Sequence, residues 1–119
     1  MNNLEQFYVS VGTQAEEVTR RLGGDPALVM RFLKKFQDDG SFRTLCAALE
    51  SGETETAFRA AHTLKGLCAT LGLQNLYVQA SGITEMLRGG GAIQPAKEAM
   101  PALKKEYDFA IEALKRLNG

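Results

Sequence analysis

The chain has 119 residues, enough for one domain of ordinary size and too few for two. Hydrophobic residues make up 45% of it, so a core can form, while 14 basic residues balance 14 acidic ones. That balance argues against nucleic acid as the main partner, because phosphate backbones select for a basic excess. The first residues hold no basic region followed by an apolar run, and no apolar stretch reaches the length of a membrane span. We therefore expect a cytoplasmic protein that does not enter a membrane.

The chain offers few metal ligands. It has one histidine and two cysteines, and Cys46 and Cys68 are not at the spacing of a metal-binding pair. Both cysteines lie in apolar helical patterns, which is typical of small buried side chains in a reducing compartment. We expect no metal site and no cofactor bound by this chain.

The first part of the chain predicts two short helices. One covers about residues 4–11 and ends at a glycine. Thr13 and Glu16 then have the spacing of a capping box, which predicts a second helix from there to residue 22. We interpret residues 1–24 as an N-terminal helical cap.

Residues 25–117 predict a series of longer helices. Asp25 and Pro26 are a start signal, a capping aspartate with proline at the first helical position, and Ser41 is a candidate cap for the next helix. We expect helices over about 26–39, 42–51, 53–71, 75–88 and 95–117, the last beginning near Pro95 or restarting at Pro101. In these helices apolar residues recur at alternating spacings of four and three, a pattern typical of the packed faces in an antiparallel helical bundle. The predicted fold is all-α: an antiparallel up-and-down four-helix bundle with additional short N-terminal helices, in a single domain over residues 1–119.

The segment around the single histidine is the most informative. When it is placed on a helix at about 100° per residue, its apolar side chains cover one face. These are Ala57, Ala60, Ala61, Leu64, Leu67, Cys68 and Leu71. His62 falls roughly 140° from Ala57 by the same period, so we expect its ring to face solvent or the rim of the bundle.

Residues three and four positions away are the neighbours of His62 on that face. Lys65 supplies positive charge beside the imidazole, which suits a dianionic phosphoryl group. Gly66 costs about 1 kcal/mol relative to alanine in a helix interior, which suggests that another molecule approaches the ring closely. Phe58 and Ala69 offer flat apolar surface to a docking partner. Each residue alone is most often an ordinary surface or packing residue, and only their combination on one exposed face favours a functional site.

These residues resemble a known family. His62-Thr63-Leu64-Lys65-Gly66, followed by Gly72, is similar to the HxLKG…G signature of histidine phosphotransfer (HPt) domains. The resemblance covers about residues 25–117 as architecture, and residues 57–73 are its specific part. It implies a four-helix bundle whose exposed histidine accepts a phosphoryl group from a receiver-domain aspartate and donates it to another receiver.

The resemblance also implies roles for single residues. His62 would be phosphorylated, Lys65 would interact with the phosphoryl group, Gly66 would leave room for the receiver, and Gly72 would end the helix. Many family members have asparagine where this chain has Thr70.

The helix after the histidine helix can be placed by turn geometry. If the chain reverses at residues 73–74, Thr84, Glu85 and Arg88 come level with His62. Thr84 and Arg88 would then contact the phosphoryl group or orient the ring, although ordinary surface roles remain open. We assign six residues to the docking surface: Phe58, Ala69, Thr70, Gly72, Thr84 and Arg88.

The function predicted from the sequence is that of a phosphoryl carrier in two-component signalling. The implied partner is a receiver domain of a response regulator, a hybrid histidine kinase, or both, with Mg²⁺ bound by the receiver and this chain a monomer. No autonomous kinase activity is expected, because Gly89-Gly90-Gly91 lacks the lysine and serine or threonine of a nucleotide-binding loop. The alternatives are a non-phosphorylated helical adaptor that docks a receiver or kinase and, with less support, a phosphohistidine-linked phosphatase that uses Glu85.

Overall fold

The computed structural model describes residues 1–118, which form α-helices joined by short loops, with no strand among them. The helices are α1 (Asn3–Ser10), α2 (Ala15–Arg21), α3 (Pro26–Gln37), α4 (Ser41–Glu50), α5 (Thr54–Leu71), α6 (Gln74–Leu87) and α7 (Ile93–Asn118). A short 3₁₀ turn, η1 (Arg88–Gly90), follows α6. The all-α prediction is confirmed.

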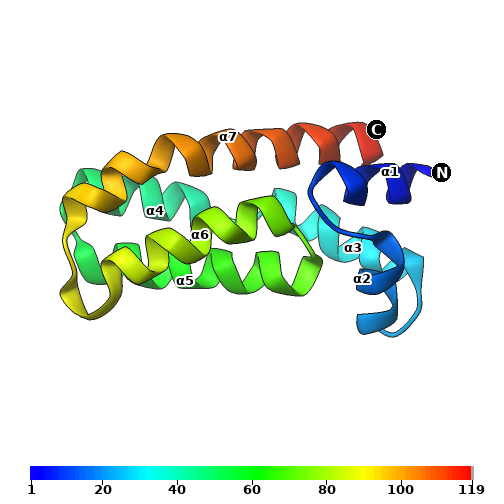
Figure 1. Ribbon diagram of the computed structural model, residues 1–119, viewed down its shortest axis with the longest axis horizontal. Helices are drawn as coiled ribbons and strands as arrows, with labels where there is room; N and C mark the ends of the chain where they lie inside the picture. The colour runs from blue at the N-terminus through cyan, green and yellow to red at the C-terminus, as the bar shows by residue number, and fades with distance from the viewer. Residues whose placement is uncertain (119) are drawn as a thin grey trace.

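The bundle consists of four rods that lie along the 43 Å length of the molecule (Figure 1). α3 and α4, one after the other, make up the first rod. α5, α6 and α7 are the other three, and they alternate in direction. α5 packs between α4 and α6, while α7 closes the bundle against α6, α3 and α4. This is the predicted antiparallel four-helix arrangement.

Local signals explain several helix ends. The Asp25 carboxylate accepts a hydrogen bond from the Ala27 amide at 2.9 Å, and Pro26 occupies the first position of α3, as predicted. Gly72 ends α5 in the left-handed conformation, with φ of +72°. Glycine adopts this conformation without a steric clash because it has no Cβ. The predicted ends of the histidine helix are therefore confirmed to within one residue.

Two predicted caps are wrong. α2 begins after Gln14 without a side-chain cap, because the Thr13 hydroxyl donates instead to the Gly72 carbonyl at 2.6 Å. α4 begins at Ser41 itself, whose amide donates to the Asp39 carboxylate at 2.9 Å. At the start of α4 the Asp39 carboxylate thus accepts the hydrogen bond expected of the cap, whereas at the start of α2 no side chain does.

The last helix is continuous, so the alternative of a restart at Pro101 is wrong. α7 begins at Ile93 and includes both Pro95 and Pro101. Pro95 lies in the first turn, where no intrahelical donor is needed. Pro101 lacks an N–H and leaves one carbonyl without its helical donor, but the proline is exposed, so water can serve that carbonyl.

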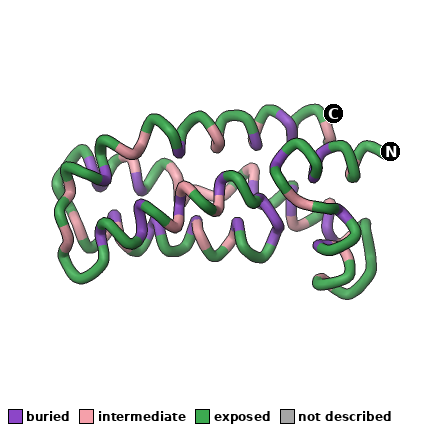
Figure 2. Tube along the Cα trace, viewed as in Figure 1, coloured by how far each residue is buried: buried purple, intermediate pink, exposed green. Residues whose placement is uncertain are grey.

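The predicted apolar faces form the core. On α6 the expected stripe is buried, and on α5 every member of the predicted face is buried except the half-buried Leu67 (Figure 2). Cys68 is buried as expected, whereas the prediction is wrong for Cys46, which is half-buried. Burial of these side chains at roughly 25 cal/mol per Å² stabilises the bundle and fixes which face of α5 points outward.

The two N-terminal helices lie at the end of the bundle where α5 turns into α6 (Figure 1). α1 packs on α7, and α2 packs on α3. The side chain of Tyr8, which belongs to α1, is fully buried. None of the helices in residues 1–118 has both the length and the apolar character needed to cross a membrane.

Candidate functional site

His62 stands on the outer face of α5, near the middle of the helix. Its neighbours Ala60, Ala61 and Leu64 are buried, which holds the helix in a fixed rotation and leaves His62 exposed. The ring of Phe58, one turn earlier, lies beside the imidazole with 5.9 Å between ring centroids and a tilt of 41°. The predicted exposure of His62 is confirmed.

Two features accompany the imidazole one turn later on α5. Lys65 is half-buried, and the ion pairs within residues 1–118 do not engage its ammonium group. A Cβ placed on Gly66 would meet no atom within 4 Å. The fold therefore does not need a glycine at this position, and an approaching molecule would find open space beside His62.

A second cation reaches the site from the end of α6. The Arg88 guanidinium donates to the Glu85 carboxylate, with a shortest distance of 2.7 Å, and its central carbon lies 5.2 Å from the centre of the Phe58 ring. Both distances are within the range of a charge-assisted hydrogen bond and a cation–π contact. Arg88, Phe58 and His62 thus form one continuous line of contacts.

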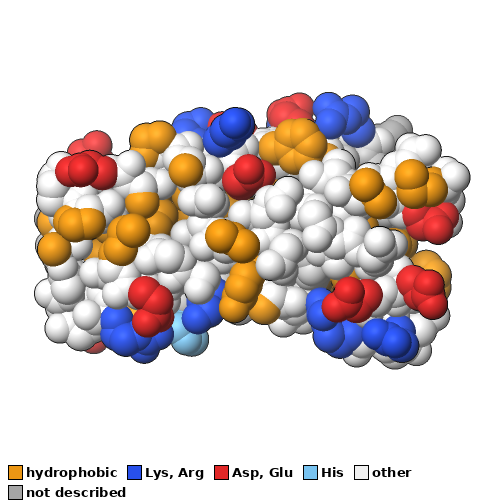
Figure 3. All heavy atoms as spheres, viewed as in Figure 1, with side chains coloured by type: hydrophobic (Ala, Val, Ile, Leu, Met, Phe, Trp, Pro, Cys, Tyr) orange, Lys and Arg blue, Asp and Glu red, His pale blue; other side chains and the backbone are white. Residues whose placement is uncertain are grey.

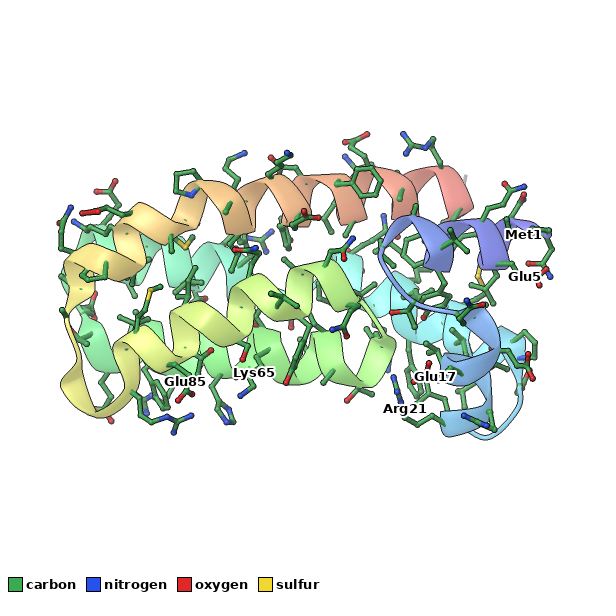
Figure 4. The ribbon with its side chains drawn as sticks, in the orientation of Figure 1. Met1, Glu5, Glu17, Arg21, Lys65 and Glu85 are labelled. Atoms are coloured by element: carbon green, nitrogen blue, oxygen red, sulfur yellow. The ribbon has the colours of Figure 1, made fainter. Side chains whose placement is uncertain are left out.

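The charges around the imidazole are coupled. The hydrogen bond from Arg88 lowers the pKa of the Glu85 carboxyl, and the charges of Lys65 and His62 lower it further. Glu85 and Lys65 lie at the same edge of the molecule (Figure 4). At that edge the single imidazole reaches the surface, with basic side chains to either side of it (Figure 3). The site is an exposed imidazole beside two cations, Lys65 and Arg88, and one carboxylate, Glu85.

Comparison with protein families matches residues 27–115 to the Hpt domain. The chain belongs to the Hpt domain family. Hpt domains are phosphocarriers that exchange phosphoryl groups with receivers and kinases in phosphorelays, and the histidine helix lies inside the matched region. No curated protein and no solved structure matches the chain.

Two residues assigned to the docking surface of this Hpt domain are misplaced. Thr84 is fully buried, and its hydroxyl donates to the Ala80 carbonyl at 2.7 Å, because the buried face of α6 is wider than the stripe of its largest apolar residues. Gly72 is also buried, since Tyr8, Thr13 and Val18 of the N-terminal segment close over it. Neither residue can meet a partner, so both predictions are wrong.

The other four stay on the surface. Ala69, Thr70 and Arg88 are exposed and Phe58 is half-buried. The carbonyls of Ala69 and Thr70 accept hydrogen bonds from Arg21 of α2 (Figure 4 labels Arg21). The surface around His62 therefore extends along α5 until it meets the N-terminal segment.

The side chains by which that segment holds α5 are not among the predicted site residues. They are Tyr8, Thr13 and Arg21. Each donates to a carbonyl near the end of α5, between 48 and 63 residues further along the chain. No local spacing could reveal such pairs. Among residues 1–118, no group of three or more His, Cys, Asp or Glu side chains could hold a metal ion.

Proposed function

We propose that this Hpt domain is a phosphorelay carrier whose phosphorylated residue is His62. The observation that carries the proposal is an exposed imidazole at the middle of α5, with the unpaired cation of Lys65 and the open space of Gly66 one turn away. A structural histidine needs neither of these neighbours. A histidine that meets the active site of another protein benefits from both.

The transfer is a nucleophilic displacement at phosphorus. The lone pair of a neutral imidazole nitrogen attacks the phosphorus of an aspartyl phosphate on the receiver, so that an N–P bond forms while the P–O bond to the aspartate breaks. The aspartate leaves as a carboxylate with the bonding electron pair, and the phosphorylated imidazolium gives its N–H proton to water. Donation to the next receiver reverses these steps.

Lys65 and Arg88 would act on the carried group through charge. Phosphoryl transfer depends mainly on positioning and on stabilisation of the charge on the phosphoryl oxygens. Lys65 forms no close ion pair within residues 1–118, whereas Arg88 is held by Glu85 and would have to exchange this partner for a phosphoryl oxygen. We therefore expect Lys65 to contribute more than Arg88.

The partner in this proposal is a receiver domain, in a response regulator, a hybrid histidine kinase, or both. The balanced net charge of the chain supports a protein partner over nucleic acid. We propose that the receiver binds the Mg²⁺ ion, that this chain works as a cytoplasmic monomer, and that it has no kinase activity of its own.

Transfer of label from a receiver to this chain tests the proposal. A receiver domain is charged with radiolabelled acetyl phosphate and mixed with wild type, His62→Gln or Lys65→Ala. We expect acid-labile, base-stable label on wild type, none on His62→Gln, and slower transfer to Lys65→Ala at unchanged folding.

The controls separate the alternatives. Thermal unfolding should give the same midpoint for the three proteins, because both substituted side chains lie outside the core. Label that persists on His62→Gln would remove His62 from the mechanism. A wild type that binds receivers with no labelling by any of them would be the non-phosphorylated adaptor instead.

A further inference from the structure

The last turn of the histidine helix is closed by side chains from the start of the chain. A helix leaves its last four carbonyls without intrahelical donors, which in α5 are those of residues 68–71. The Cys68 carbonyl nevertheless accepts from the amide of Gly72, the residue that ends the helix, and from the Leu73 amide at 3.0 Å, as is usual for a helix that ends at glycine. The next carbonyls are served by residues that lie before α3.

Three side chains supply these donors. Arg21 donates through one nitrogen to the carbonyls of Ala69 and Thr70, at 2.9 and 3.1 Å. The Tyr8 hydroxyl donates to the Leu71 carbonyl at 2.7 Å. The Thr13 hydroxyl donates to the carbonyl of Gly72, the residue that ends the helix, at 2.6 Å. We call Tyr8, Thr13 and Arg21 the clasp.

The segment that carries the clasp also holds the start of the next helix. The Val11 carbonyl accepts from the Asn75 amide at 3.1 Å, in the first turn of α6. Tyr8 is fully buried, Thr13 is half-buried, and Arg21 is exposed with Glu17 as an ion-pair partner at 3.8 Å. Tyr8, Thr13 and Arg21 all precede residue 27, where the match to the Hpt domain begins.

The clasped turn lies within reach of a partner that docks on His62. Ala69 is seven residues after His62, or about 10 Å along the helix axis. A protein interface of ordinary size covers about 800 Å² on each partner, which is wide enough to include both residues. The exposed positions Ala69 and Thr70 belong to this turn, and the hydrogen bonds from Arg21 fix their backbone.

We propose that Tyr8, Thr13 and Arg21 are positioning residues for receiver docking, because they hold the last turn of α5 in the shape that the receiver meets. The inference rests on the proposed function, in which a receiver docks around His62. It predicts that loss of the clasp weakens docking and leaves the chemistry at the imidazole unchanged, since His62 lies two turns away from the clasped residues.

Four variants test the clasp. Tyr8→Phe and Thr13→Val each remove a hydroxyl at nearly constant shape, Arg21→Ala removes two hydrogen bonds, and a combined variant removes all of them. Arg20→Ala is the matched control, an exposed arginine of the same helix whose side chain forms no hydrogen bond or ion pair within residues 1–118. Thr13→Ser keeps the hydroxyl and should behave as wild type.

Amide hydrogen exchange measures how strongly the clasp stabilises the last turn of α5. The amides of Gly72, Leu73 and Asn75, which donate to backbone carbonyls, should exchange about fivefold faster for each hydrogen bond lost, while Arg20→Ala leaves them unchanged. Far-UV circular dichroism checks that each variant is folded. If the combined variant does not fold, Arg21→Ala alone decides the matter, because Arg21 is exposed and outside the core.

Transfer kinetics measure docking. The receiver domain that phosphorylates wild type fastest in a panel is used at increasing concentration. We expect the half-saturating receiver concentration to rise several-fold in the combined variant and in Arg21→Ala, with the maximal rate kept. Direct labelling of His62 by phosphoramidate, which needs no partner, should proceed equally in all variants.

The outcomes distinguish the inference from the proposed function. If exchange becomes faster while half-saturation stays at the wild-type value, the clasp is purely structural and the inference is wrong. Unchanged exchange in every variant also overturns it. If the wild type accepts no phosphoryl group from any receiver, the proposed function itself fails, and the inference fails with it.

Discussion

The Glu85 carboxylate holds the Arg88 guanidinium at 2.7 Å, at the edge of the molecule where the His62 ring is exposed. Arg88 in turn lies over Phe58, the ring beside His62. A phosphoryl dianion on His62 would repel Glu85 and compete with it for Arg88. The Glu85 carboxylate should therefore destabilise the negatively charged phosphoryl group that His62 is proposed to carry.

Replacing Glu85 by glutamine should lengthen the lifetime of the phosphohistidine. The substitution removes a negative charge and releases Arg88 toward the phosphoryl group. The protein is labelled with phosphoramidate, and loss of label is followed over time, with a several-fold slower loss expected for Glu85→Gln. Glu112→Gln is the control, since Glu112 forms an exposed pair of the same spacing with Lys115 on α7. Equal lifetimes in both variants would show that Glu85 does not act on the carried group.

Gly66 should be replaceable for the fold but not for docking. Because a Cβ at Gly66 meets open space and its φ is not positive, Gly66→Ala should raise the free energy of unfolding by about 0.5–1 kcal/mol. Gly66→Gln should keep the fold and block transfer from the receiver. Gly82→Ala in α6 meets equally open space and should give the same gain in urea unfolding. Normal transfer to Gly66→Gln would mean that the receiver does not approach this turn.

Gly72 should be required for the fold. Alanine there would hold a left-handed conformation, and its Cβ would clash with Val18. We expect Gly72→Ala to lower the free energy of unfolding by about 2–4 kcal/mol, the sum of backbone strain and overpacking. Gly52 has a similar φ of +73° but open space around it, so Gly52→Ala should show only the backbone part, about 1 kcal/mol. Equal losses in the two variants in urea unfolding would exclude the clash.

The free energy of unfolding should decrease at alkaline pH because the Cys68 thiol is buried. Burial raises the pKa of the Cys68 thiol to about 12, from 9.0 in the unfolded chain. Between these values the unfolded chain loses the proton and the folded chain keeps it, so the free energy of unfolding decreases as the pH rises above about 9. Urea unfolding at pH 8 and pH 10 measures the decrease, which should be smaller in Cys68→Ala. The same decrease in both proteins would mean that other groups, such as the buried Tyr8 hydroxyl, account for it.

The histidine helix was predictable because its pattern is local. Small and aliphatic side chains recur on one face over about four turns, and the glycine after Leu71 marks the end, so the outward direction of His62 follows from the sequence alone. Arg88 was placed level with His62 by counting turns from the reversal, and its contact with Phe58 agrees with that placement.

The errors arise where packing between distant segments decides. Thr84 was counted as surface because the stripe of large apolar residues on α6 does not include it, yet α6 packs against both α5 and α7 and buries a wider face. Thr13 was counted as a cap from its spacing to Glu16, but a hydroxyl can donate to whichever carbonyl the fold brings near it. Two short helices before residue 25 could be predicted, whereas the residues that make their contacts with α5 could not.

The place of His62 along α5 has a consequence for how a signal would be read. The ring is about 12 Å from either end of the helix, and both neighbouring turns are anchored by buried side chains. A group added to such a ring touches neither end of α5, so the backbone of this helix should have the same shape in the loaded and the empty protein. A partner would then tell the two states apart by the charge at this point on the surface and by the position of the Arg88 side chain that the charge attracts.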